Sequence, residues 1–208
     1  MAKFLEVQYF YPFLNMDYAE AFMAMENSDQ PMNIIVSEGY GGYCDTLNLL
    51  LSLIENSKKP TMTIVPSVAM SCNLGLFVAG TKGLRIVSPR ATCLLHQVGS
   101  GAIGKASDIE SENKEIQRLN NELAYKLYDK AGGHEEGFTK NLVKENFNAD
   151  LYLTPEQMVE YGWADKIMSV NEIFTNLDNL YKDYEAMKDK IEINESLEIM
   201  PTIPAIGE

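Results

Sequence analysis

Two spacings of apolar residues alternate along the chain. Short runs rich in β-branched and aromatic residues are typical of strands, whereas apolar residues three and four positions apart mark one face of a helix. Between residues 45 and 55, Leu47, Leu50, Leu51 and Ile54 follow the helical spacing directly after a glycine turn. Strands that alternate with helices in this way predict βαβ units in a mostly parallel sheet, and hence an α/β fold.

The same pattern predicts the order of the elements. Strands are predicted over residues 3–13, 33–37, 61–65, 84–87 and 91–96. Helices are predicted over residues 16–27, 45–55, 67–80, 107–131, 155–161 and 172–190. From Glu192 onward, two prolines, few aromatic residues and an acidic end predict a frayed tail.

Two of these helices begin with capping signals. Ser107 has the spacing to cap the helix over 107–131, with Glu110 reaching back as in a capping box. Thr154 precedes a proline and stands three residues before Gln157, which is a second capping box. Gly162 is expected to end that short helix.

Length and charge limit the classes of function. A chain of 208 residues predicts one substantial domain with a tail. A net charge of −13 argues against nucleic acid and anionic membranes as partners, because both require a basic surface. No apolar run reaches the roughly 18 residues of a membrane span, and the first residues lack the layout of a secretory signal, which predicts a cytoplasmic protein.

The cysteines do not indicate a disulfide framework or a metal site. Cys44, Cys72 and Cys93 form an odd set without metal-type spacing, so reduced thiols are expected. The chain is therefore expected to work without a metal or cofactor.

Only two histidines are present, His96 and His134. His134 lies in a turn-like Gly-Gly-His-Glu-Glu segment that is expected to be solvated. His96 ends an apolar strand just before a glycine-rich loop, and strand ends of this kind hold the sites of α/β proteins. A histidine there is, taken alone, more often structural.

Ser71 and the Gly41-Gly42 pair are the other candidates for chemistry. Ser71 lies near the start of a small-residue helix, where unpaired backbone N–H groups can hold an oxyanion after the serine attacks a carbonyl. The glycine pair lets a substrate approach the backbone closely. Each feature alone is common in purely structural positions.

Together these segments resemble the proteolytic subunit of the Clp proteases over about residues 33–168. The resemblance rests on the glycine pair Gly41-Gly42, on Ala69-Met70-Ser71, on the run Ala79-Gly80-Thr81-Lys82-Gly83-Leu84-Arg85, on His96-Gln97, on Gly104-Lys105-Ala106-Ser107-Asp108-Ile109-Glu110 and on Glu160-Tyr161-Gly162-Trp163-Ala164-Asp165. Their order and spacing match the family. The resemblance implies a fold shared with the crotonases, a peptidase domain over 1–170 with a protruding strand–helix handle at about 97–131, and a helical extension with a flexible tail over 171–208.

The resemblance also implies a serine peptidase mechanism. Ser71 would be the nucleophile and His96 the base, and counting back from Tyr161 the third member of the triad falls on Asp150. The N–H groups of Gly42 and Cys72 would stabilise the tetrahedral oxyanion. The residues implied in substrate binding are Gly41, Val98, Gly99, Ser100 and Gly101.

By the same resemblance, the substrates are unfolded or extended polypeptides that pair with strand edges of the handle. They would be cleaved inside the chamber of a homo-oligomeric ring, as a heptamer or as stacked rings. An ATP-driven unfoldase is the implied further partner.

Four features depart from the family pattern. Asn73 and Ser67 stand where the family has glycine and predict a more crowded pocket. Ala149 replaces an arginine that takes part in contacts between stacked rings. About 32 residues precede the strand that starts at Asn33, which is short for the axial loop of the family.

Three other functions remain open at this point. A Clp-like head-maturation protease of tailed viruses shares the fold and the triad but cleaves capsid and scaffold proteins. A crotonase would use the same fold and two backbone amides to bind an acyl-CoA thioester, without the triad. A non-catalytic ring subunit would only shape a mixed assembly.

Overall fold

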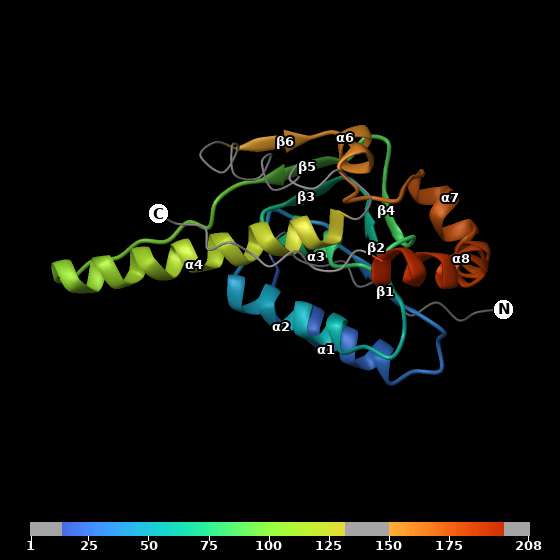
Figure 1. Cartoon of the computed structure of the whole chain (residues 1–208), viewed down its shortest axis with the longest axis horizontal. Helices are drawn as coiled ribbons and strands as arrows, with labels where there is room; N and C mark the ends of the chain where they lie inside the picture. Colours follow the sequence, from blue (N-terminus) through green and yellow to red (C-terminus); the bar gives the residue numbers. More distant parts are fainter. Residues whose placement is uncertain (1–13, 132–149, 198–208) are drawn as a thin grey trace.

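The computed structural model describes residues 14–131 and 150–197, and it is an α/β fold as predicted (Figure 1). The strands are β1 (Asn33–Val36), β2 (Thr61–Val65), β3 (Val68–Met70), β4 (Arg85–Val87), β5 (Thr92–Leu95), β6 (Leu151–Leu153) and β7 (Lys166–Ile167). The helices are α1 (Met16–Glu26), α2 (Cys44–Glu55), α3 (Cys72–Val78), α4 (Ala106–Ala131), α6 (Pro155–Glu160), α7 (Val170–Thr175) and α8 (Leu177–Leu197). The predicted strand over 3–13 and His134 lie outside the described residues.

The strands form two sheets. Strands β1, β2, β4 and β7 make a sheet in that order with parallel pairing throughout. In the second sheet β5 lies between β3, which is parallel to it, and β6, which is antiparallel. The predicted parallel arrangement is therefore confirmed, with β6 as the antiparallel exception.

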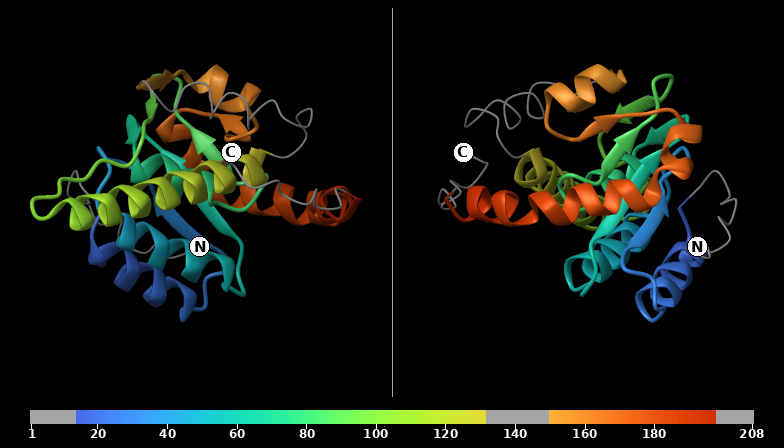
Figure 2. Two further views of the ribbon diagram at one scale, coloured as in Figure 1. Left: turned by 60° about the vertical axis from the view of Figure 1, so that its left-hand side comes forward. Right: turned by 90° about the vertical axis from the view of Figure 1, so that its right-hand side faces the viewer.

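Helices cover both faces of the four-stranded sheet. On one face Ile35 of β1 packs with Leu50 of α2 and Leu76 of α3, and α1 lies beside α2 (Figure 2). On the other face Ile64 and Ile86 pack with α7 and α8. Helices α7 and α8 are therefore part of the hydrophobic core.

A third group of buried side chains joins the two sheets. Val65 at the end of β2 packs with Phe77 of α3 and with Cys93 of β5. Met158 and Trp163, in and after α6, close the same cluster. The second sheet is thereby held against α3, the helix that follows Ser71.

The predicted helix over 67–80 is wrong in its first third. Residues 68–70 form strand β3, because their backbone pairs with β5 and Ala69 also bridges Gly39. Helix α3 then starts only at Cys72. Small apolar residues do not distinguish a buried strand from a buried helix, so this boundary depends on tertiary pairing.

The capping box predicted at Ser107 is also wrong, although the long helix is present. Helix α4 begins at Ala106, and the Asp108 carboxylate accepts from the Lys105 N–H at 3.1 Å. Glu110 instead forms an ion pair with Lys114. Asp108 therefore accepts the main-chain N–H bond at the start of the helix that was predicted for Glu110.

The later elements are close to prediction. Thr154 and Gln157 form the predicted capping box, and Gly162 adopts a positive φ of 69° after α6. The predicted helix over 172–190 is divided into α7 and α8, and α8 continues to Leu197, so the frayed tail expected from Glu192 is corrected over 192–197. The rest of that tail lies outside the described residues.

A buried ion pair joins two of the motifs that carry the resemblance. The Arg85 guanidinium lies 2.7 Å from the Asp165 carboxylate, and their side chains are 2% and 14% exposed. The same carboxylate accepts from the Gly83 N–H at 2.7 Å and from the Arg85 N–H at 2.9 Å. Asp165 therefore connects the start of β4 to the turn before β7. The motifs that contain Arg85 and Asp165 thus have a structural role.

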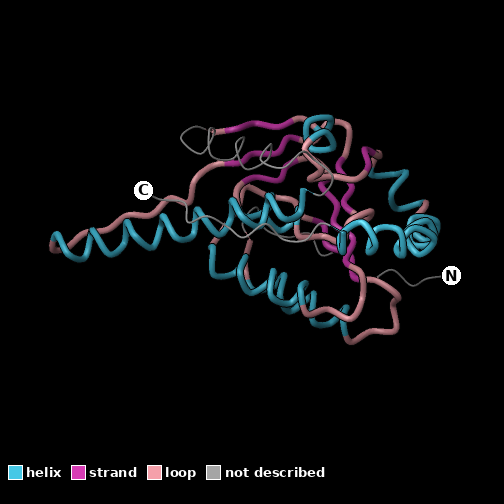
Figure 3. The backbone as a smooth tube through the Cα atoms, viewed as in Figure 1, coloured by secondary structure: helices cyan, strands magenta, loops and turns pink. Residues whose placement is uncertain are grey.

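The segment between β5 and α4 forms no strand within the described residues. Residues 97–105 run as a loop beside α4, which extends away from the sheets (Figures 1 and 3). Val98 donates its N–H to the Asn120 side chain at 2.7 Å, while Gly99, Ser100 and Gly101 are exposed. The predicted handle strand is thus corrected to a loop, because a strand requires a neighbour to pair with.

Candidate active site

Ser71 lies at the sharp turn between β3 and α3. Its backbone has φ 55° and ψ −124°, and it is the only non-glycine residue of the described ranges with a positive φ. Its N–H donates to the Leu94 carbonyl of β5 at 2.9 Å, which holds the turn against the neighbouring strand. Such a backbone costs on the order of 1–3 kcal/mol and is typical of functional sites.

His96 follows the neighbouring strand at the same edge of the sheet. The parallel register pairs Met70 with Leu94, so Ser71 and His96 both lie just beyond the carboxyl ends of adjacent strands. His96 is half-buried. This edge is where parallel strands present functional side chains.

Asp150 lies opposite His96 by the register of the antiparallel pair. Leu95 pairs with Leu151, so Asp150 falls one position beyond that pair, as His96 does. Residues directly opposite in such a ladder carry their side chains on the same face, with Cβ atoms about 5 Å apart. The structure thus brings the three predicted residues to one edge of the small sheet.

No hydrogen bond joins the side chains of Ser71, His96 and Asp150 within the described residues. In free enzymes the contacts of a catalytic group are often long and shorten only when substrate binds. The spatial order of serine, histidine and aspartate is nevertheless the order that a triad requires.

The Gly41-Gly42 turn packs directly against the serine. A Cβ added to Gly41, whose φ is 111°, would lie 2.7 Å from the Ser71 Cβ. The Gly41 carbonyl accepts from the Leu14 N–H at 2.6 Å. Because a trans peptide directs its C=O and N–H to opposite sides, the Gly42 N–H points away from Leu14.

Two backbone N–H groups beside the serine have no oxygen acceptor among the described residues. They belong to Gly42 and to Cys72, the first residue of α3. An orphan N–H is usual in the first turn of a helix but not in a tight turn. Neither N–H is held by a carbonyl of the described residues, so each can bind an oxygen of a substrate; the Gly42 backbone otherwise lies near the weakly accepting Cys72 sulfur.

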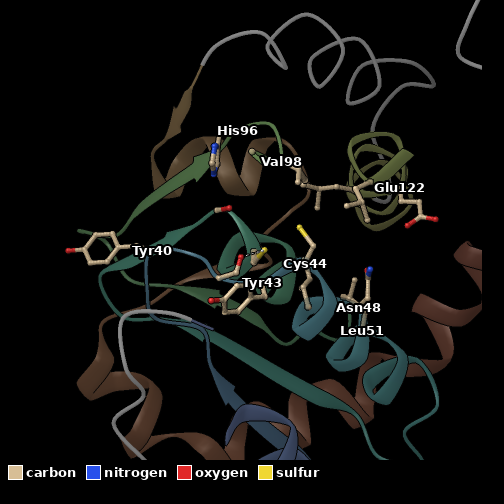
Figure 4. A pocket seen from close by; sticks show the side chains of 15 residues that line it. Tyr40, Tyr43, Cys44, Asn48, Leu51, His96, Val98 and Glu122 are labelled. Atoms are coloured by element: carbon tan, nitrogen blue, oxygen red, sulfur yellow. Dashed lines mark hydrogen bonds between the residues drawn. The ribbon is translucent and has the colours of Figure 1, made fainter. Parts of the chain in front are cut away.

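These groups line one cavity of about 620 Å³. Ser71, Cys72, His96, Gly42, Val98 and Gly99 of the predicted site all contribute to it. Figure 4 shows His96 and Val98 on one side and Cys44, Asn48 and Leu51 of α2 on the other. A volume of this size suits an extended side chain or a short peptide segment.

The other predicted site residues lie around the cavity. Gly41 is buried beneath it, whereas Ser100 and Gly101 are exposed farther along the loop. Asp150 is exposed and stands behind His96 instead of lining the cavity.

Comparison with known proteins decides the family. A sequence profile of the family described as Clp protease matches residues 17–171, well over half of the chain. The chain belongs to the Clp protease family. Members of the family are serine peptidases, so this protein is a serine-type endopeptidase. The alternative of a crotonase that acts on acyl-CoA is therefore rejected.

Individual relatives in the Clp protease family agree with the profile. The ATP-dependent Clp protease proteolytic subunit 3 of Synechococcus sp. (strain CC9605) is 30% identical over 149 residues, which cover 71% of this chain and 72% of the relative. The ATP-dependent Clp protease proteolytic subunit of Dehalococcoides mccartyi (strain CBDB1) is 32% identical over 158 residues, covering 73% and 72%. Among the described helices, none is both long and apolar enough to cross a membrane.

The two glycine replacements relative to the Clp pattern do not crowd the cavity. Neither Asn73 nor Ser67 is among its lining residues. The Ser67 hydroxyl and N–H both bind the Glu38 carboxylate, and Asn73 is buried under the glycine turn. The predicted crowding is therefore wrong, while Ala149 lies outside the described residues.

Sequence reasoning missed most of the far wall of the cavity. Leu119, Glu122 and Leu123 of α4 line it together with Leu47 and Leu51 of α2. The helical spacing of α2 indicated a buried face but not what that face meets. The contribution of α4 depends on how a distant helix packs, for which the local sequence carries no signal.

Cys44 also lines the cavity, and its thiol is the most acidic of the three. A hydrogen bond with the Cys72 thiol lowers the pKa of Cys44 from 9.0 to about 7. The Cys72 hydrogen has two acceptors within reach, the Cys44 sulfur and the Gly42 carbonyl at 3.3 Å. Hydrogen bonding to Cys44 and burial raise the pKa of Cys72, and burial raises that of Cys93 to about 12.

Alkylation with iodoacetamide should therefore modify Cys44 selectively. Its rate should reach half of its maximum near pH 7 and level off above about pH 8, because the thiolate is the reactive form. Peptide mapping after timed quenching at each pH would measure it, with Cys44→Ser as the control. A rate that still rises steeply at pH 9, or equal labelling of Cys93, would contradict the assigned acidity.

Proposed function

We propose that Ser71, His96 and Asp150 form the catalytic triad of this endopeptidase. The observation that carries the proposal is the strained backbone of Ser71 at the end of β3, in register with the end of β5 where His96 lies. His96 takes the Ser71 proton during attack on the peptide carbonyl and returns it to the leaving amine. Asp150 holds the imidazole in the tautomer that leaves its other nitrogen free to accept this proton.

The oxyanion of the tetrahedral intermediate is held by the Gly42 and Cys72 N–H groups. Gly42 and Cys72 line the cavity beside Ser71, and their N–H groups have no oxygen acceptor among the described residues. Each donor of this kind typically contributes about 3 kcal/mol to stabilising the transition state. Metal ions have no part in this mechanism as proposed.

Extended polypeptides are the proposed substrates. From Gly99 onward the loop is exposed and its backbone has no strand partner among the described residues, which supports pairing with a substrate strand. Gly41 beneath the cavity and Val98 and Gly99 along its wall complete the binding site, and Ser100 and Gly101 continue it outward. Backbone pairing tolerates many side chains, so specificity is modest.

The protein acts, in this proposal, as a homo-oligomeric ring in the cytoplasm. Proteolytic subunits of the Clp family generally form rings with ATPase partners, and the relatives named above carry "ATP-dependent" in their names. The extended α4 and its loop supply a surface for contacts between subunits (Figure 1). An unfoldase would then deliver substrates to the chamber.

Labelling with a fluorophosphonate probe tests the catalytic assignment. The native chain should be labelled, while Ser71→Ala and His96→Ala should not, because the probe reacts only with an activated serine. Ser52→Ala, an exposed serine of α2, is the matched control and should label normally. Absence of labelling in assembled native protein would instead favour the non-catalytic ring subunit.

A further inference from the structure

Asn73 is buried beside the nucleophile, and its side chain binds the glycine turn. The residue is 0% exposed and stands second in α3. Its Oδ1 accepts a hydrogen bond from the Gly41 N–H at 3.0 Å. Its main-chain carbonyl accepts from the Ser37 hydroxyl at 2.7 Å.

The Gly41 N–H defines which way the Asn73 carboxamide points. The Gly41 N–H must face an acceptor, so a carboxamide rotated by 180° would place two donors against each other. The Oδ1 atom of Asn73 therefore faces Gly41, and its buried NH₂ group makes no hydrogen bond among the described residues. Only this orientation gives the Gly41 N–H its acceptor.

Asn73 and Leu14 together fix two consecutive peptide groups. Asn73 holds the N–H of the peptide between Tyr40 and Gly41, and Leu14 holds the carbonyl of the next peptide at 2.6 Å. Gly41, at φ 111°, would otherwise rotate freely, since glycine has few steric limits. The direction of the Gly42 N–H thus depends on both bonds.

We propose that Asn73 is a positioning residue that aims the Gly42 N–H at the oxyanion. The inference rests on the proposed function, because that function assigns the oxyanion to Gly42. It also accounts for an asparagine at a position where the resemblance leads one to expect glycine. Asn73 acts through the turn and does not touch the substrate.

Kinetics of Asn73→Ala test this role. The oxyanion exists only in the transition state and intermediate, so kcat should fall about tenfold with KM changed less than about twofold. Asn73→Asp keeps an acceptor oxygen at the same position and should restore at least about a third of the native kcat. An unchanged kcat in Asn73→Ala would overturn the proposal, as would a KM effect alone.

Ser37→Ala is the matched control. It removes the other buried hydrogen bond of Asn73 but leaves the carboxamide in place. Thermal unfolding should therefore begin at a lower temperature, as expected for loss of a buried bond, while kcat stays native. Equal kcat losses in Ser37→Ala and Asn73→Ala would reduce Asn73 to a general packing role and overturn the proposal.

Hydrogen–deuterium exchange separates this inference from the proposed function. The peptide containing Gly41 should exchange about tenfold faster at one amide in Asn73→Ala, and not in Ser37→Ala, because Gly41 loses its acceptor. This readout does not require hydrolysis, so it would still report on the turn if the native chain failed to label. If the Gly41 amide exchanged at the native rate in Asn73→Ala, the inference would be wrong even if the enzyme were active.

Discussion

Replacing Asp150 by asparagine is expected to lower the kcat of peptide hydrolysis by about four orders of magnitude. Asparagine has the size of aspartate but cannot stabilise an imidazolium, and its amide can favour the wrong tautomer of His96. Asp150 immediately precedes β6, and the strand register places it opposite His96. Because Asp150 is exposed, the substitution disturbs no core packing. Steady-state cleavage of a fluorogenic peptide would measure the loss.

The control for this variant is Asp178→Asn, at an exposed carboxylate in the first turn of α8. It makes the same chemical change far from His96 along the chain and should leave kcat near native. Native activity in Asp150→Asn would show that another group orients the imidazole. Unfolding midpoints of both variants should match the native one.

Replacing Gly41 by alanine should cost about a hundredfold to a thousandfold in kcat/KM. The new Cβ would lie 2.7 Å from the Ser71 Cβ and 3.0 Å from its hydroxyl oxygen. The φ of 111° is also strained for any residue with a Cβ. Relief of either conflict moves the serine or rotates the turn, and each displaces the oxyanion donors.

Gly75→Ala serves as the comparison for that experiment. Its Cβ would meet the end of the Leu47 side chain at 3.1 Å, which is a flexible contact, and its helical backbone accepts alanine. Peptidase activity should stay within about threefold of native. Similar losses in both variants would mean that the glycine turn has no special part in catalysis.

The secondary structure could be predicted where the spacing or type of neighbouring residues identifies the element. The helix face of Leu47, Leu50 and Leu51 and the β-branched run of β2 are local patterns, and both elements appear where they were expected. The two errors in strand assignment fall at residues 68–70 and at the handle strand. In both places the backbone conformation depends on whether a distant segment pairs with it.

The candidate site was predicted as a set of residues but not as a geometry. Ser71, His96 and Asp150 were selected through motif order, and β3, β5 and β6 bring them to one edge of a sheet. The positive φ of Ser71 has no signature in its neighbours, because a strained turn persists only when surrounding contacts enforce it. The catalytic roles remain to be tested by the variants described above.

The sequence by itself determined the alternation of strands and helices, the Clp motifs and the acidic net charge, since these depend on residue type and local spacing. The tertiary structure alone decided that Asn73 reaches Gly41, that α4 forms a wall of the cavity, and that α7 and α8 cover the sheet. Each of these contacts joins segments far apart along the chain. Their formation depends on packing and register, which no local pattern encodes.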